Sequence, residues 1–222
     1  FRSNLQRFYF PECKAYELDH RGADRKHRKR FWNAVGSFGS YYPEPLDAIL
    51  RENQAAFSSR DCRPLVPTLM QNVYANRFAA DEKTIYTLYN ATGHSVAGPM
   101  LRLPRLAGHH AVELLSGREL RGRAADDGLS LEGYIPRDEV LCVAWLPKRL
   151  KVASQGRRLK VEIAQETTRG QIVLCGAEGK RLLDVPAKQP MEIDLGELPD
   201  GQRPVCVKLL SQGQLVDCVG LP

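Results

Sequence analysis

The sequence predicts a mainly β protein in which two antiparallel β-sandwich-like domains follow a short helical segment. Three observations lead to this fold class. Helical spacing is confined to the first third of the chain, short runs of alternating apolar and polar residues fill the middle third, and the alternation resumes after a basic bridge. We therefore expect a helical segment at residues 1–73 and β-domains at residues 74–150 and 151–222.

The composition predicts a globular chain with no membrane span. The chain has 222 residues, of which 43% are hydrophobic, and its 32 Lys or Arg against 26 Asp or Glu give a net charge of +6. The longest uninterrupted apolar run, Val140 to Leu146, is far shorter than the roughly 20 residues that cross a bilayer, so no membrane partner is expected. The first residue is Phe1 and not Met, and we expect the chain to begin part-way through a longer protein.

The chain has six cysteines, and none belongs to a CxxC pair. This spacing excludes zinc-ribbon and thiol-redox motifs, and we expect neither a metal nor another cofactor. We favour buried, reduced thiols. An even count also permits three disulfides, so the cellular compartment stays open.

The first third contains two predicted helices. Asp24 is a suitable N-cap for a helix that runs to about Val35 and is stopped by Gly36. Pro45 suits the first turn of a second helix, whose apolar residues fall on or near one face as far as Phe57.

Extended pieces flank these helices. Residues 7–10 form a short aromatic run ended by Pro11, and residues 14–18 are a second extended piece. Two prolines should hold residues 63–68 extended, as a connector to the β-rich part of the chain.

A dense basic run lies within the first predicted helix. It consists of Arg25, Lys26, Arg28, Lys29 and Arg30. Such a run can meet phosphates, but a solvated helix face is the favoured interpretation. Nucleic acid is therefore not an expected partner.

The two β-regions each contain five predicted strands separated by turn residues. In the middle third the β-type runs lie at residues 84–89, 96–103, 111–115, 129–135 and 139–146. In the last third they lie at residues 159–164, 171–175, 191–195, 205–210 and 215–219, with Gly179, Gly201 and Gly213 in turns. Short strands at this spacing are typical of antiparallel sheets.

Part of the middle third is similar to a known domain. The stretch NRFAADEKTIYTLYNATGHSVAGPMLRLP at residues 76–104, followed by HHAVELLSGREL at 109–120 and LSLEGYIPRDEVLCVAWLP at 129–147, resembles the β-sandwich that closes many glycoside hydrolases of the α-amylase and α-galactosidase kind. In those enzymes the sandwich packs on the end of a catalytic (β/α)8 barrel. The motifs that carry the resemblance are structural, so they identify a scaffold and not a catalytic site.

The resemblance implies that the helical segment is the tail of such a barrel. Residues 5–10 would then be a late barrel strand, and Glu12 would lie just beyond its carboxyl end, where barrel enzymes hold substrate. A complete barrel needs about 250 residues, so the resemblance implies that an N-terminal barrel region is missing from this chain. If its partner strands are missing, Phe8, Phe10, Phe31 and Trp32 should form an exposed apolar patch.

Candidate site residues are few. Glycoside hydrolysis requires two carboxyl groups across the scissile bond, and Glu12 is the single catalytic candidate, for which a surface ion pair is the favoured interpretation. Tyr41 and Tyr42 stand in a proline-flanked loop where an aromatic ring could stack on a sugar, so they are the carbohydrate-binding candidates. No residues with metal-ligand spacing accompany them.

Three hypotheses for function follow. The leading one is the C-terminal accessory part of a glycoside-hydrolase-like protein that is catalytically incomplete on its own. The alternative is an independent module that binds carbohydrate or another protein. The third is a self-contained enzyme with a site that no motif reveals. The sequence identifies neither the sugar nor the oligomeric state.

Overall fold

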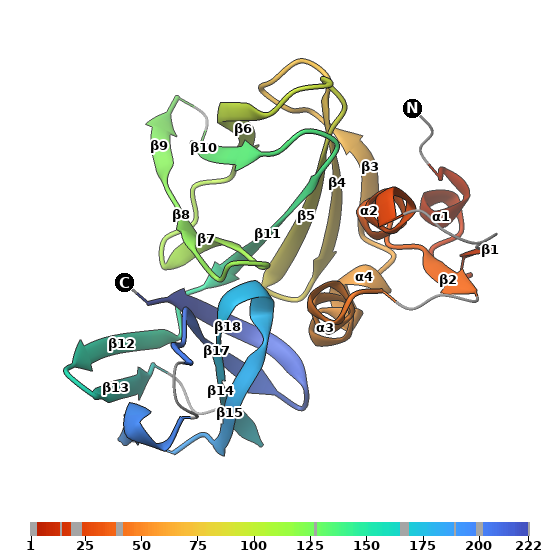
Figure 1. The fold of residues 1–222 in the computed structure, drawn as a ribbon. Helices are drawn as coiled ribbons and strands as arrows, with labels where there is room; N and C mark the ends of the chain where they lie inside the picture. The colour runs from red at the N-terminus through yellow and green to blue at the C-terminus, as the bar shows by residue number, and fades with distance from the viewer. Residues whose placement is uncertain are drawn as a thin grey trace.

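The computed structural model describes residues 4–13, 15–18, 24–38, 42–126, 128–164, 169–188, 190–198 and 202–221. The protein is mainly β, as predicted, and consists of several antiparallel sheets with a few short helices near the N-terminus (Figure 1). No helix in these ranges is long and apolar enough to span a membrane.

The N-terminal region contains a parallel strand pair. Its elements are α1 (Gln6–Tyr9), β1 (Tyr16–Leu18), α2 (Asp24–Trp32), β2 (Gly36–Phe38), α3 (Glu44–Glu52) and α4 (Gln54–Phe57). Strands β1 and β2 pair in parallel, and α2 lies between them in the sequence. A parallel pair needs a crossover connection, and a helix is the usual one.

The prediction of an extended strand at residues 5–10 is wrong. The backbone N–H groups of Phe8 and Tyr9 both donate to the Leu5 carbonyl, and that of Phe10 donates to Gln6, so the segment turns into α1. A single helical turn puts Phe8 into the core while its aromatic neighbours stay exposed. Aromatic residues favour strands where they pack on a half-buried pleated sheet, and this segment does not pack in that way.

The two predicted helices are present with shifted ends. Helix α2 begins at Asp24 and ends at Trp32, because the positive φ of Ala34 turns the chain and Gly36 then begins β2. Pro45 lies in the first turn of α3, as predicted, but the second helix is divided, and Phe57 belongs to α4.

The middle third forms two facing sheets. Six strands form one sheet in the order β3-β4-β5-β11-β7-β8: β3 (Cys62–Val66), β4 (Val73–Ala80), β5 (Lys83–Asn90), β11 (Val140–Pro147), β7 (His109–Glu113) and β8 (Glu119–Leu120). Three strands form the other in the order β6-β10-β9: β6 (Val96–Leu103), β10 (Gly128–Ile135) and β9 (Gly122–Ala125). Leu88 and Trp145 from the first sheet meet Met100 and Leu131 from the second in one buried cluster. The predicted connector at residues 63–68 is largely the edge strand β3.

The last third forms two smaller sheets. One has the order β12-β13-β16, with β12 (Leu150–Gln155), β13 (Arg158–Ile163) and β16 (Met191–Asp194). The other has the order β15-β14-β17-β18, with β15 (Arg181–Pro186), β14 (Gly170–Cys175), β17 (Cys206–Ser211) and β18 (Gln214–Gly220). Leu159 and Val161 of the first sheet pack against Ile172 and Val207 of the second.

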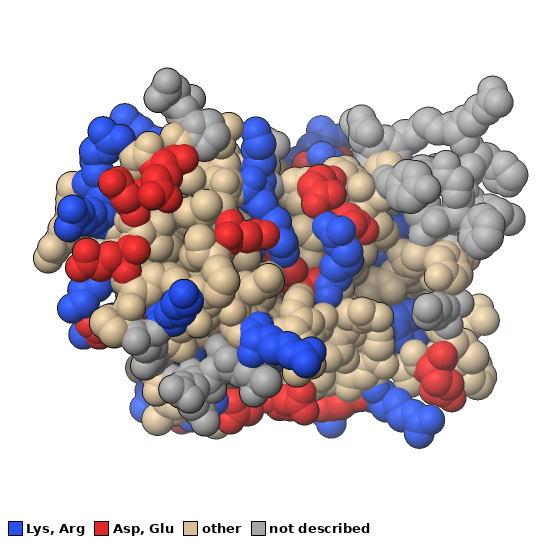
Figure 2. Space-filling view, turned by 90° about the horizontal axis from the view of Figure 1, so that it is seen from below, with Lys and Arg blue, Asp and Glu red and all other residues tan. Residues whose placement is uncertain are grey.

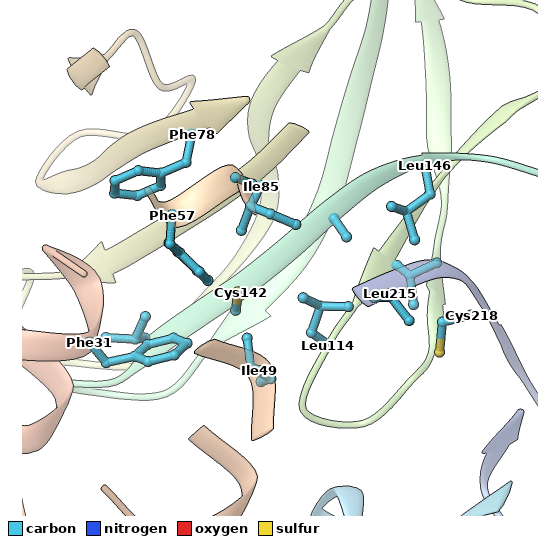
Figure 3. Close-up of a cluster of buried hydrophobic side chains, with 14 of the residues drawn as sticks. Phe31, Ile49, Phe57, Phe78, Ile85, Leu114, Cys142, Leu146, Leu215 and Cys218 are labelled. Atoms are coloured by element: carbon cyan, nitrogen blue, oxygen red, sulfur yellow. The ribbon is translucent and has the colours of Figure 1, made fainter. Parts of the chain in front are cut away.

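A third apolar core joins all three parts of the chain. Phe31 and Ile49 from the helices, Ile85 from the six-stranded sheet, and Leu215 and Cys218 from β18 belong to one cluster (Figure 3). The predicted exposed patch is therefore wrong for Phe8, Phe31 and Trp32, which this cluster buries, and right for Phe10, which is 55% exposed. The domain boundaries proposed from the sequence stay a prediction.

Candidate functional site

An apolar pocket lies between the helices and one end of the six-stranded sheet. It has a volume of about 470 Å³. Helix α2 contributes Arg28 and Phe31, which are one turn apart and so face the same side. Its apolar wall consists of Phe31, Pro43, Pro45, Leu46, Leu115 and Val140.

Two carboxylates line this pocket, and both have partners. Glu139 forms an ion pair with Arg28. Burial raises the pKa of the Glu139 carboxyl, and the nearby guanidinium offsets part of that rise. Glu113 accepts the backbone N–H groups of Leu115 at 2.8 Å and Ser116 at 2.7 Å, so it shapes the turn that follows β7. The pocket can therefore hold an apolar group beside one ion pair, and both carboxylates already have partners.

The sequence-predicted site residues do not come together. Glu12 is exposed in the turn that follows α1, and it does not line the pocket. Tyr41 lies outside the described residues. Tyr42 is half-buried, donates its hydroxyl hydrogen to the Val35 carbonyl, and packs edge-on against Phe31 with 6.3 Å between ring centroids. Its ring thus supports the pocket wall, and a contact with carbohydrate stays a prediction.

The basic run of α2 is divided among different environments. Arg28 pairs with Glu139, Lys29 lies over the Tyr89 ring, and Arg30 is buried. The expectation of a solvated face is therefore wrong for Arg30. The side chains of the first two members of the run lie outside the described residues. On the face shown in Figure 2, basic and acidic side chains are interspersed.

A charge cluster around the buried pair of Glu52 and Lys208 joins α3 to the last sheet. The Glu52 carboxylate contacts Lys208 Nζ at 2.8 Å and an Arg181 guanidinium nitrogen at 3.0 Å. Burial lowers the pKa of Lys208, but Glu52, together with Cys175 and Cys218, raises it overall. The cluster connects residues more than 120 positions apart in the sequence, so its role is to hold elements together.

A histidine–carboxylate pair fixes the connector between the last two β-regions. His110 Nε2 and Asp217 Oδ1 lie 2.6 Å apart, and both residues are buried. Asp217 also accepts the backbone N–H groups of Arg149, Leu150 and Cys218, each at 2.7 Å. The other ring nitrogen of His110 lies 3.5 Å from a Glu119 carboxylate oxygen, where a nucleophilic triad would need a serine or cysteine.

Sequence reasoning missed both of these buried groups of charges. Lys208 and Asp217 each interrupt an otherwise apolar strand, and a charge at an inward-facing strand position is the signal that could have found them. Within the described ranges, no three side chains of His, Cys, Asp or Glu are arranged to hold a metal ion.

Comparison with solved structures gives a distant likeness. No protein-family model matches the chain, and no curated protein matches its sequence. Among solved structures, gamma-CGTase from the alkalophilic Bacillus clarkii is similar at 11% identity and a TM-score of 0.31. The match covers 80% of this chain and 28% of that chain. A TM-score this low supports no conclusion about activity.

Proposed function

We propose that this chain is the C-terminal accessory part of a glycoside-hydrolase-like protein, with its N-terminal region belonging to a (β/α)8 barrel. The observation that carries the proposal is the parallel unit formed by β1, α2 and β2. It is the single parallel pair among the described strands, and it precedes the antiparallel sheets in the sequence. Two parallel strands are too few for a stable sheet, which favours continuation into further strands.

Exposed apolar side chains near the parallel unit support the same proposal. Tyr9 is 74% exposed, and Phe10 and Tyr16 are each more than half exposed. Large side chains of this kind gather where another surface packs. The missing barrel region is the partner that the resemblance of residues 76–147 implies for this surface.

The buried carboxylates and those that line the first pocket fit a catalytically incomplete chain. Glu113 and Glu139 in the pocket are held by backbone N–H groups and by Arg28. Glu52 and Asp217 are buried in contacts that hold elements together. The acid and the nucleophile of a glycosidase must both reach the scissile bond, and in this proposal the barrel region supplies them.

The proposal is tested by reading the gene upstream of Phe1 and expressing both forms. We expect an open frame with alternating strand and helix patterns over about 180 residues, since a barrel needs about 250 in total. The longer protein should hydrolyse nitrophenyl α-glycosides, and this chain alone should not. A stop codon directly upstream, or hydrolysis by the present chain that Glu12→Gln abolishes, would overturn the proposal.

The pocket favours a second candidate, an independent module that binds carbohydrate or another protein. Its apolar wall beside the Arg28–Glu139 pair suits an apolar ring face next to polar groups. A glycan array with the chain alone should then show binding that Leu46→Arg removes. Leu69→Arg, at an exposed position outside the pocket, is the matched control. An array with no signal would contradict carbohydrate binding.

A further inference from the structure

A second pocket has a buried lysine in its wall. It has a volume of about 420 Å³ and lies where the β4–β5 turn, α4 and the β17–β18 hairpin meet. Lys83, the first residue of β5, is buried and lines this pocket. The two-residue turn before it, Asp81 and Glu82, forms part of the rim.

The hydrogen-bond partners of the Lys83 amine are backbone carbonyl oxygens. Its Nζ donates to the Leu215 carbonyl at 2.8 Å and lies 3.5 Å from the Glu52 carbonyl. None of the ion pairs among the described residues includes it. The Glu52 carboxylate is occupied by Lys208 and Arg181.

This environment suits a neutral amine. The two N–H groups of a neutral amine can donate to the two carbonyl oxygens, and these contacts do not use its lone pair. Burial lowers the pKa of Lys83 to about 8, and the nearby charges of Glu52 and Asp81 limit that fall. The remaining charges at the pocket are those of Glu82, which pairs with Arg149 at 2.6 Å.

We propose that Lys83 is a reactive amine that condenses with small neutral aldehydes entering this pocket. The Nζ lone pair attacks the carbonyl carbon and gives a carbinolamine. The former carbonyl oxygen then leaves as water with two protons, one from the nitrogen and one from solvent, and the protonated imine remains. Asp81 and Glu82 at the rim disfavour anionic carbonyl compounds. This role is independent of the proposed function.

The test is reductive trapping with glycolaldehyde and cyanoborohydride, which delivers hydride to the imine and leaves a stable secondary amine. Peptide mass spectrometry then gives the rate at each lysine of the whole chain. Lys151, whose side chain is 82% exposed, is the reference. At neutral pH we expect Lys83 to react at least about tenfold faster than Lys151, because a lysine with an ordinary pKa is almost fully protonated there.

Controls separate reactivity from a structural role. Unfolding in guanidinium chloride should equalise the two rates, and Lys151→Arg should leave the Lys83 rate unchanged. The Lys83 rate should also reach half its maximum near pH 8. A native Lys83 that reacts no faster than Lys151 would overturn the proposal and leave it as a hydrogen-bond donor between strands.

Discussion

Buried thiols are among the residues whose ionisation the fold changes most. Four of the six cysteines are buried and all six are free, as the sequence analysis favoured. Burial raises the pKa of Cys142 well above its ordinary value of 9.0. The hydrogen bond between Cys175 and Cys206, together with burial, raises the pKa of Cys175. These thiols stay protonated in the folded protein and ionise only when it unfolds.

This difference predicts a loss of stability at alkaline pH. The unfolded thiol releases its proton above about pH 9 while the folded one keeps it, so the unfolded state binds fewer protons and the free energy of unfolding falls. Each such thiol contributes about 1.4 kcal/mol per pH unit. Urea unfolding between about pH 8 and pH 10, with reductant present, measures the slope.

Matched variants assign the slope to particular residues. Cys142→Ala should flatten it by one thiol's share, and Cys13→Ala, at an exposed position, is the control. Lys83 acts in the opposite sense over the same range, because its pKa is lowered to about 8 and its burial costs less as the pH rises towards 10.5. An unchanged slope in Cys142→Ala would contradict the assignment.

Among the elements, the turn between β7 and β8 approaches the last sheet closely. Gly117 in this turn has a φ of 69°, and a Cβ added there would lie 2.3 Å from Cys206 Cβ on β17. Only glycine permits both the backbone conformation and this contact. The turn therefore helps to set how the six-stranded sheet meets β17.

Gly117→Ala should be among the most destabilising glycine substitutions in the chain. The positive φ costs about 1 kcal/mol, and the overlap with Cys206 adds about 1–3 kcal/mol. Gly108→Ala is the control, because Gly108 has a φ of 74° and nothing within 4 Å of an added Cβ. Chemical denaturation measures the free energy of unfolding of both variants. Equal losses would show that the contact with Cys206 does not contribute to the cost of Gly117→Ala.

The sequence predicted the strands better than the N-terminal elements. Short β-type runs such as residues 84–89 and 139–146 were identified because each strand buries one or both faces. The aromatic run at residues 5–10 led to a wrong strand prediction, because a short helix buries Phe8 equally well. The parallel partner of β1 lies 20 residues further along the chain, and the local sequence of Gly36–Phe38 does not predict this pairing.

The candidate sites were less predictable than the fold. Arg28 and Glu139 belong to separate regions of the sequence and meet only in the folded chain. Lys208 and Asp217 are visible in the sequence as charges within apolar strands, but their partners lie 156 and 68 residues away. Periodicity carries no information about such distant pairs.

At the scale of the whole molecule, one core and one charge cluster tie the parts together. The cluster that contains Phe31, Ile85 and Leu215 draws on every third of the chain. The Glu52–Lys208 contact adds a buried ion pair across the same junction. We therefore expect the parts to unfold together.

A single cooperative transition should be visible with independent probes. Fluorescence reports Trp32 and Trp145, and urea-dependent alkylation of Cys175, read by mass spectrometry, reports the last sheet. The two midpoints should coincide, and alkylation at lower urea would contradict cooperativity.

Lys208→Ala should lower both midpoints together. It leaves the buried charge of Glu52 without one partner, which should reduce the free energy of unfolding by about 3 kcal/mol. Lys160→Ala, at an exposed position, should lower neither.

The carboxylate that holds the connector has a consequence for biosynthesis. Asp217 accepts the backbone N–H of Arg149 across 68 residues of intervening chain. On the ribosome the connector therefore emerges long before the group that fixes it, and each β-region can assemble its strands while tethered loosely to the other. Emergence of β18 then fixes their mutual position, so the two β-regions dock only after the connector has been made.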